Sequence, residues 1–121
     1  MSRLDDIRKL QNRTKAFTVS IIAFFTELPK TEVARTIGRQ FLRSGTSVAA
    51  NYRAACRARS SADFISKISI VLEETDETLF WLELLVEADV IGESGCRVLR
   101  IECNELLKIF AASLATAKRN R

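Results

Sequence analysis

The sequence predicts an all-α protein: an up-and-down antiparallel four-helix bundle that forms a single domain over residues 1–121. Three observations predict this fold class. Four long segments carry apolar residues at the three- and four-residue spacing of an amphipathic helix. One proline and four glycines in 121 residues leave little material for turns. No segment has a convincing strand pattern, in which apolar and polar residues alternate.

Composition indicates an ordinary globular chain, with 47% hydrophobic and 28% charged residues and a net charge of +4. The first residues contain no apolar secretory core, and the richest apolar run, residues 79–86, is interrupted by Glu83 and too short to span a bilayer. Cys56, Cys96 and Cys103 are odd in number and match no disulfide framework. We therefore expect a reduced, cytoplasmic protein with buried thiols and no membrane association.

The first helix is expected at about residues 5–28. Its apolar face follows helical spacing and consists of Ile7, Leu10, Thr14, Phe17, Ile21, Phe24 and Leu28. Pro29 ends the helix, because the residue before a proline is pushed out of the helical region. Thr31 is the expected N-cap of the next helix.

The second helix, at about residues 31–58, carries the most informative pattern. At 100° per residue, Arg35, Arg39, Arg43, Arg53 and Arg57 fall on one side of the helix. The opposite side is predicted to be buried and holds Val33, Ile37, Phe41, Val48 and Tyr52. All five cations are arginine, whose planar fork matches phosphate better than lysine does. The ridge is therefore a candidate phosphate-binding surface, although a solvated charged face is the alternative.

Small residues accompany this ridge. Thr46 and Ala50 lie between its two arginine groups and predict a shallow saddle with basic ends. Gly38 and Gly45 lie on the flank of the apolar face, where a glycine costs roughly 1 kcal/mol against alanine. Close approach of a neighbouring helix is the favoured explanation, ahead of contact with a ligand.

The third helix is expected at about residues 61–88, with Ser60 and Asp63 as a capping box. Its core stripe consists of Phe64, Ile68, Val71, Leu72, Thr75, Leu79, Leu82 and Val86. Phe80, Trp81 and Leu84 lie off this stripe, so the helix is apolar nearly all round there. An extra apolar face in so small a domain predicts a subunit interface anchored by Trp81, rather than a merely adhesive surface.

The third helix is also acidic, and we expect its carboxylates to pair with basic neighbours rather than to perform acid–base chemistry. The fourth helix is expected at about residues 94–118, with Ser94 as its cap. Its predicted apolar stripe is Val98, Leu99, Leu106, Ile109, Phe110, Ser113 and Ala117. The chain then ends in a basic tail with Lys118, Arg119 and Arg121.

The sequence contains no histidine, which argues against the usual serine and cysteine triads and against most zinc or iron sites. The cysteines lack metal-site spacing, and no glycine-rich loop follows a strand. A nucleophilic Cys56, activated by Arg53 and Arg57, is the one enzymatic alternative, but its place on the packing flank disfavours it. We predict a protein that is not an enzyme and has no catalytic residue, cofactor or metal.

Four segments of the chain are distinctive: residues 47–53 (SVAANYR), 57–65 (RARSSADFI), 70–78 (IVLEETDET) and 81–85 (WLELL). In these segments the chain resembles the bacterial four-helix bundle proteins encoded by intervening sequences of 23S rRNA genes. Ala49 and Ala54 depart from the family pattern, which usually has proline or glycine at the first position and often glutamate near the second. The resemblance implies an antiparallel bundle and, in several relatives, a homopentamer. A related protein, the accessory variability protein of diversity-generating retroelements, works with a reverse transcriptase and nucleic acid.

The leading functional hypothesis is a homo-oligomeric accessory protein that binds nucleic acid, with RNA favoured over DNA, through the arginine ridge. Lys118, Arg119 and Arg121 form a second, weaker set of candidate contacts. Each phosphate that is neutralised releases counterions, so modest ridges repeated around an oligomer give salt-sensitive affinity. The alternative is a scaffold bundle with no nucleic-acid role, in which the arginines pair with carboxylates of a neighbouring third helix.

Overall fold

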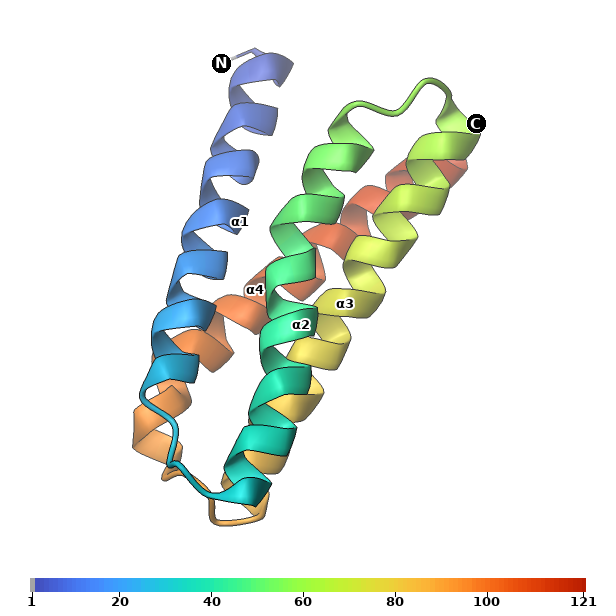
Figure 1. Ribbon diagram of the computed structural model, residues 1–121. Coiled ribbons are helices and arrows are strands. Elements are labelled where there is room, and N and C mark those ends of the chain that lie inside the picture. Colours follow the sequence, from blue (N-terminus) through green and yellow to red (C-terminus); the bar gives the residue numbers. More distant parts are fainter. Residues whose placement is uncertain (1) are drawn as a thin grey trace.

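The computed structural model describes residues 2–121 and confirms the predicted fold class. It consists of α1 (Arg3–Thr26), α2 (Glu32–Cys56), α3 (Ser61–Glu87) and α4 (Glu93–Arg119), and the described residues contain no strand. Short linkers join helices that run in alternating directions (Figure 1). The helix bounds lie within two residues of those predicted from the sequence.

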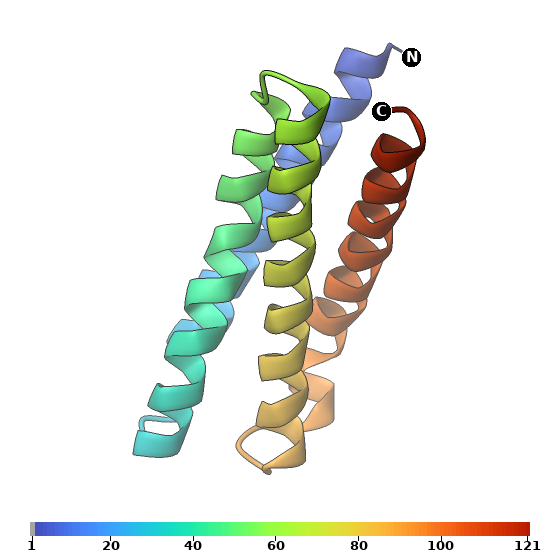
Figure 2. The same cartoon turned by 90° about the vertical axis from the view of Figure 1, so that its right-hand side faces the viewer.

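The four helices do not pack equally against one another. The α2–α3 pair has the most extensive contact, and the α1–α4 pair has the least. The amino-terminal half of α1 and the carboxyl-terminal half of α4 diverge in Figure 1, and Figure 2 shows the same bundle from the side. The bundle is therefore tight along α2 and α3 and partly open between its first and last helices.

Two of the predicted helix starts are confirmed in detail. The Thr31 hydroxyl accepts a hydrogen bond from the Ala34 amide, and Ser60 accepts one from the Asp63 amide. The return bond of the Ser60 capping box is different from the prediction, because the Asp63 carboxylate accepts the Arg59 amide instead. Each side-chain oxygen nevertheless satisfies an amide that has no partner within the helix.

Two other helix starts differ from the prediction. The first helix begins two residues earlier than expected, since Ser2 and Asp5 form a complete capping box. Ser94 was expected to cap the last helix, and this expectation is wrong. Gly92 is the N-cap and supplies no side-chain bond, because α4 already begins at Glu93.

The core is formed by one continuous cluster in which Phe17, Ile21, Phe41, Leu82 and Phe110 are buried. In α4 the buried stripe is Cys96, Leu99, Cys103, Leu106 and Phe110. Two core predictions are wrong. Val33 is 56% exposed because it lies in the first turn of α2, at the margin of the buried stripe. Val98 is 83% exposed because it precedes Leu99 by about 100° and faces the open side of the bundle.

The two glycines of α2 lie in its contact with α1 and the linker that follows α1. A Cβ built on Gly45 would lie 2.6 Å from Cγ2 of Ile21, and one on Gly38 would lie 2.9 Å from Cδ1 of Leu28. The nearest atoms at both sites are side-chain atoms of α1 and of the linker that follows it. These contacts support the predicted close helix approach.

Candidate nucleic-acid interface

The α2 arginines stand on an unbroken helix that passes through Gly45 without interruption. All five predicted ridge residues are exposed. Arg57 is the C-cap, so the last ridge arginine lies just beyond the helix end rather than within it. The five side chains have three different surroundings: α3, the groove between α1 and α2, and the linker between these two helices.

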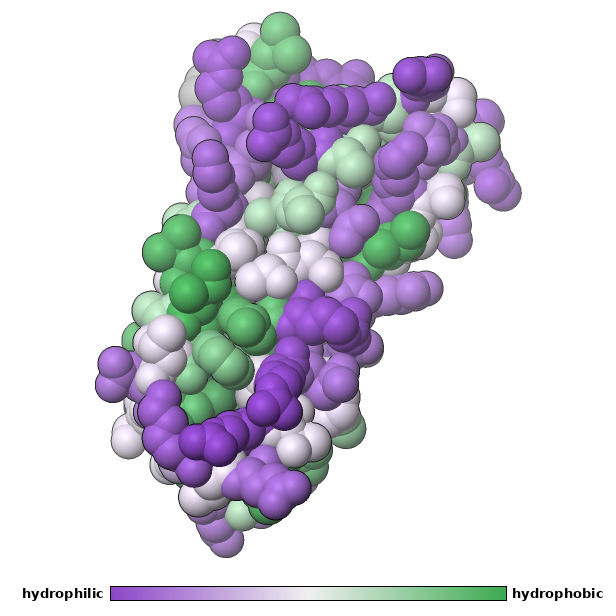
Figure 3. Space-filling view, viewed as in Figure 1, coloured by the Kyte–Doolittle hydropathy of each residue, from purple (hydrophilic) through white to green (hydrophobic). Residues whose placement is uncertain are grey.

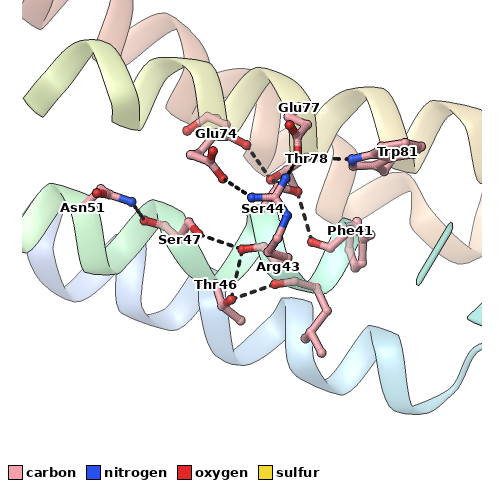
Figure 4. Close-up of polar contacts among 12 residues, drawn as sticks. Phe41, Arg43, Ser44, Thr46, Ser47, Asn51, Glu74, Glu77, Thr78 and Trp81 are labelled. Carbon is pink, nitrogen blue, oxygen red and sulfur yellow. Dashed lines mark hydrogen bonds and ion pairs between the residues drawn. The ribbon is translucent and has the colours of Figure 1, made fainter. Parts of the chain in front are cut away.

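Arg43 turns toward α3 and pairs with its carboxylates (Figure 4). Its Nη1 lies 3.6 Å from Oε2 of Glu74, and its Nη2 donates a hydrogen bond to Oε2 of Glu77. The same Glu77 oxygen accepts the indole N–H of Trp81 at 3.3 Å. A polar chain therefore runs from the arginine ridge on α2 to the aromatic surface on α3.

Beneath this chain, a buried hydroxyl pair joins the same two helices. The Thr78 hydroxyl lies 3.0 Å from that of Ser44, and both residues are fully buried. Thr78 also lies 2.7 Å from the Glu74 carbonyl and Ser44 lies 3.2 Å from the Phe41 carbonyl, so one hydroxyl donates to the other and the second donates to a carbonyl of its own helix. Buried polar groups are tolerated when they are hydrogen-bonded, and this pair fixes the register of α2 against α3.

Arg53 and Arg57 face the other neighbour, α1. Together with Lys15 they line a groove of about 490 Å³ between α1 and α2, in which Thr46 and Ala50 supply small side chains. No aspartate or glutamate lines this groove. Figure 3 shows hydrophilic side chains over the upper ends of the two helices and a paler band below them. The saddle predicted from the sequence therefore has a second wall, which comes from α1.

Arg35 and Arg39 lie near the linker between α1 and α2. They line a smaller depression of about 250 Å³ with Lys30. Within residues 2–121, the carboxylates make no ion pair with Arg35, Arg39, Arg53 or Arg57. Four of the five ridge arginines thus remain available to an external anion.

The second set of basic candidates lies at the other end of the chain. Lys118 and Arg119 are in the last turn of α4, and Arg121 follows it. Cations in a last turn interact favourably with the negative end of the helix dipole, which gives these residues a structural role as well. They are on a different helix from the α2 ridge.

The predicted interface residues of α3 form a partly exposed aromatic surface. Phe80 is 51% exposed, whereas Trp81 and Leu84 are half-buried. The rings of Phe80 and Trp81 meet edge to face with centroids 4.9 Å apart. Trp81 also packs against the core cluster, so truncating it affects the monomer as well as any interface.

A second apolar surface, missed in the sequence, lies between α1 and α4. It is a groove of about 820 Å³ whose lining includes Phe17, Phe24, Val98 and Ile101. Exposed Val19 and Ile22 add to the apolar surface of α1. The sequence signal that could have predicted this groove is that α1, like α3, carries apolar residues outside its core stripe.

Arg13 makes the ion pair that crosses the α1–α4 side. Its guanidinium lies 2.6 Å from Glu102 and 3.0 Å from Glu105. The hydrogen bond to Glu102 is the main reason that the pKa of Arg13 is raised above its usual value. Together with the Arg43 pair, this contact shows that the bundle neutralises some arginines internally and leaves others open.

All three cysteines are free thiols; Cys96 and Cys103 are buried as predicted, whereas Cys56 is only half-buried. Burial raises the pKa of the Cys103 thiol to about 12. No group of three histidine, cysteine or acidic residues within 2–121 is placed to hold a metal ion. None of the described helices is long and apolar enough to cross a membrane.

Comparison with known proteins gives a consistent family assignment. The profile of the 23S rRNA-intervening sequence protein family matches residues 8–112. A crystal structure of a protein of unknown function from the S23 ribosomal protein family of Bacteroides thetaiotaomicron is 34% identical. The match covers 86% of this chain and 96% of that one, with a TM-score of 0.80. A comparison with curated proteins gave no match. The chain belongs to the 23S rRNA-intervening sequence protein family.

Proposed function

We propose that this protein is a non-enzymatic, homo-oligomeric accessory protein that binds nucleic acid without sequence specificity, with RNA favoured over DNA. The observation that carries the proposal is the state of the α2 arginines. Arg35, Arg39, Arg53 and Arg57 are exposed and have no ion-pair partner among the described residues. Unpaired guanidinium groups on one helix are suited to a run of phosphates.

The distribution of charge strengthens this argument. The chain has 15 acidic residues, six of them on α3 between Glu73 and Glu87, yet α3 neutralises only Arg43 of the ridge. A bundle held together by charge pairing would engage more of its arginines. Few aromatic side chains are exposed to stack on bases, so the affinity would come from the phosphate backbone and would be insensitive to sequence.

Self-association is the second part of the proposal, and two apolar surfaces support it. One is the Phe80 and Trp81 surface of α3, and the other is the groove between α1 and α4. Two different surfaces on one chain suit heterologous contacts, in which one surface of a subunit binds the other surface of the next subunit. Such contacts form a closed ring when repeating the rotation between neighbouring subunits leads back to the first subunit. Each subunit of such an assembly would contribute its own arginine ridge, so several modest ridges would bind one nucleic acid together.

A salt titration tests the nucleic-acid part. Fluorescence anisotropy with a labelled single-stranded RNA and the same DNA sequence should show tighter RNA binding. The logarithm of the association constant should fall with the logarithm of salt concentration, by about 0.7 per phosphate neutralised. Arg35→Ala with Arg53→Ala should lower both affinity and slope. Arg97→Ala with Lys108→Ala removes the same charge from exposed positions of α4 and is the matched control.

Light scattering tests the oligomer part, since the monomer has a mass of 13.6 kDa. The family resemblance implies five subunits, or about 68 kDa, five times the monomer mass. Phe80→Ser should shift the distribution toward the monomer while helicity is retained, because Phe80 is half exposed. A monomeric wild-type protein at micromolar concentration would overturn this part.

The scaffold alternative rests on Arg43. Its pairing with Glu74 and Glu77 is the intramolecular contact that this alternative predicts. If the other four arginines meet carboxylates of a second copy, the Arg35→Ala and Arg53→Ala variant will change the oligomer mass. RNA binding will then be absent in the wild type at every salt concentration.

A further inference from the structure

We infer that the groove between α1 and α2 is the seat of a single nucleic-acid strand, with Lys15 of α1 opposing Arg53 and Arg57 of α2. This inference rests on the proposed function and names the form of nucleic acid and the residues of the second wall. The groove is lined by residues of two helices and holds about 490 Å³.

The chemistry of the lining selects an anion. Lys15, Arg53 and Arg57 are exposed, and no acidic residue lines the groove to neutralise them. Within residues 2–121, none of the three makes an ion pair. Gln11 and Asn12 add amide groups that can both donate and accept. A ribose 2′-hydroxyl also donates and accepts, so the amides suit RNA.

The hydroxyl groups of the groove floor do not compete for the ligand as donors. Thr14 donates to the Gln11 carbonyl, Thr18 to the Thr14 carbonyl, and Thr46 to the Leu42 carbonyl. The donors that remain free belong to the charged and amide side chains of the lining. We therefore expect a phosphate to bind the cationic side chains of the groove rather than the threonine hydroxyls of its floor.

The shape of the groove selects a single strand. The groove holds about 490 Å³ and is bounded by two packed helices, whose axes typically lie about 8–10 Å apart, so we expect it to hold one sugar–phosphate backbone rather than both strands of a duplex. Arg53 and Arg57 lie about 6 Å apart along the axis of α2, and Lys15 faces them from α1. Cations on both walls of a channel that follows the backbone are typical of single-strand binding. No aromatic residue lines the groove, so bases would not stack there.

The first arm of the test removes the α1 cation. In anisotropy titrations with a labelled single-stranded RNA, Lys15→Ala should reduce the salt slope by about 0.7, the value for one phosphate contact on a single strand. Lys15→Arg should keep the slope. Lys108→Ala, which removes a lysine from an exposed position of α4, should leave it unchanged.

The second arm fills the groove without changing the charge. Ala50 is exposed and lines the groove, so Ala50→Phe should weaken single-strand binding to the level of the Arg53→Ala and Arg57→Ala double variant. Ala111→Phe places the same ring on exposed α4 as a control. A duplex of the same sequence should bind the wild-type protein more weakly than the single strand.

The outcomes separate this inference from the function on which it rests. If the wild type binds no oligonucleotide, the proposed function fails. If the wild type binds but Lys15→Ala and Ala50→Phe behave like their α4 controls, the groove is not the seat and the ridge alone carries binding. Duplex binding at least as tight as single-strand binding also overturns the groove assignment.

Discussion

Gly45→Ala is the sharpest test of how α1 and α2 pack. Alanine improves helix propensity by about 1 kcal/mol, so an exposed glycine in the middle of α2 would be stabilised by this change. Gly45 is buried, however, and the new Cβ would lie 2.6 Å from Cγ2 and 3.0 Å from Cγ1 of Ile21. Ile21 is fully buried and branched at Cβ, so it has little freedom to withdraw.

The expected magnitude follows from these opposing effects. Overpacking a core costs about 1–3 kcal/mol, and a contact this close belongs in the upper part of that range. After the propensity gain, Gly45→Ala should lower the free energy of unfolding by about 1–2 kcal/mol. Gly38→Ala is the internal comparison, because its nearest neighbour is the terminal Cδ1 of Leu28 at 2.9 Å. That methyl group can move, so this variant should stay within about 1 kcal/mol of the wild type.

Urea unfolding followed by circular dichroism measures both variants. A double-mutant cycle with Ile21→Ala then isolates the contact, since removing the Ile21 branches makes room for the new methyl group. The double variant should be more stable than the sum of the single changes predicts, by at least about 1 kcal/mol. Additive changes, or a Gly45→Ala protein more stable than the wild type, would refute the close approach.

Two further predictions concern charge and protonation. Arg43→Ala should lower the free energy of unfolding by no more than about 1 kcal/mol, because the Arg43–Glu77 pair is partly exposed. The variant should nevertheless change the fluorescence emission of Trp81, the only tryptophan, because Glu77 accepts a hydrogen bond from its indole. Arg53→Ala should leave that emission unchanged, and equal spectra for the two variants would contradict the Arg43–Glu77–Trp81 chain. Burial raises the pKa of Cys103 from 9.0 to about 12, so the unfolded chain ionises first and stability should fall between about pH 9 and pH 12. Cys103→Ala should reduce that slope in pH-dependent urea unfolding, and an unchanged slope would mean that another buried group, such as Tyr52, is responsible.

Much of the fold could be predicted because the helices carry local signals. Pro29, Thr31 and Ser60 mark helix ends through backbone chemistry that depends on a few neighbouring residues. The errors occur where the outcome depends on another helix. Val98 has the same chemistry as a core residue, and it is the rotation of α4 against its neighbours that buries Leu99 and leaves Val98 exposed.

The candidate site was less predictable for the same reason. A helical wheel places the five arginines on one face of α2, but it does not predict which neighbouring helix each arginine faces. Arg43 pairs with the carboxylates of α3, whereas Arg53 lines a groove together with Lys15 of α1. The contribution of Lys15 could not be read from α2, because it depends on how α1 is rotated about its own axis.

This division of the ridge decides which arginine can discriminate between the two functional hypotheses. Arg43 pairs with Glu77, which also holds Trp81, so its substitution affects the ridge and the aromatic surface together. Loss of RNA binding in an Arg43 variant would be compatible with a damaged oligomer as well as with a lost phosphate contact. Arg53 and Arg57 make no ion pair with α3, although Arg57 also lines a depression with Asp63 of α3, and both line an acid-free groove with α1. Their substitution leaves the Glu77–Trp81 contact in place, and the choice between nucleic-acid binder and scaffold therefore rests on these two residues.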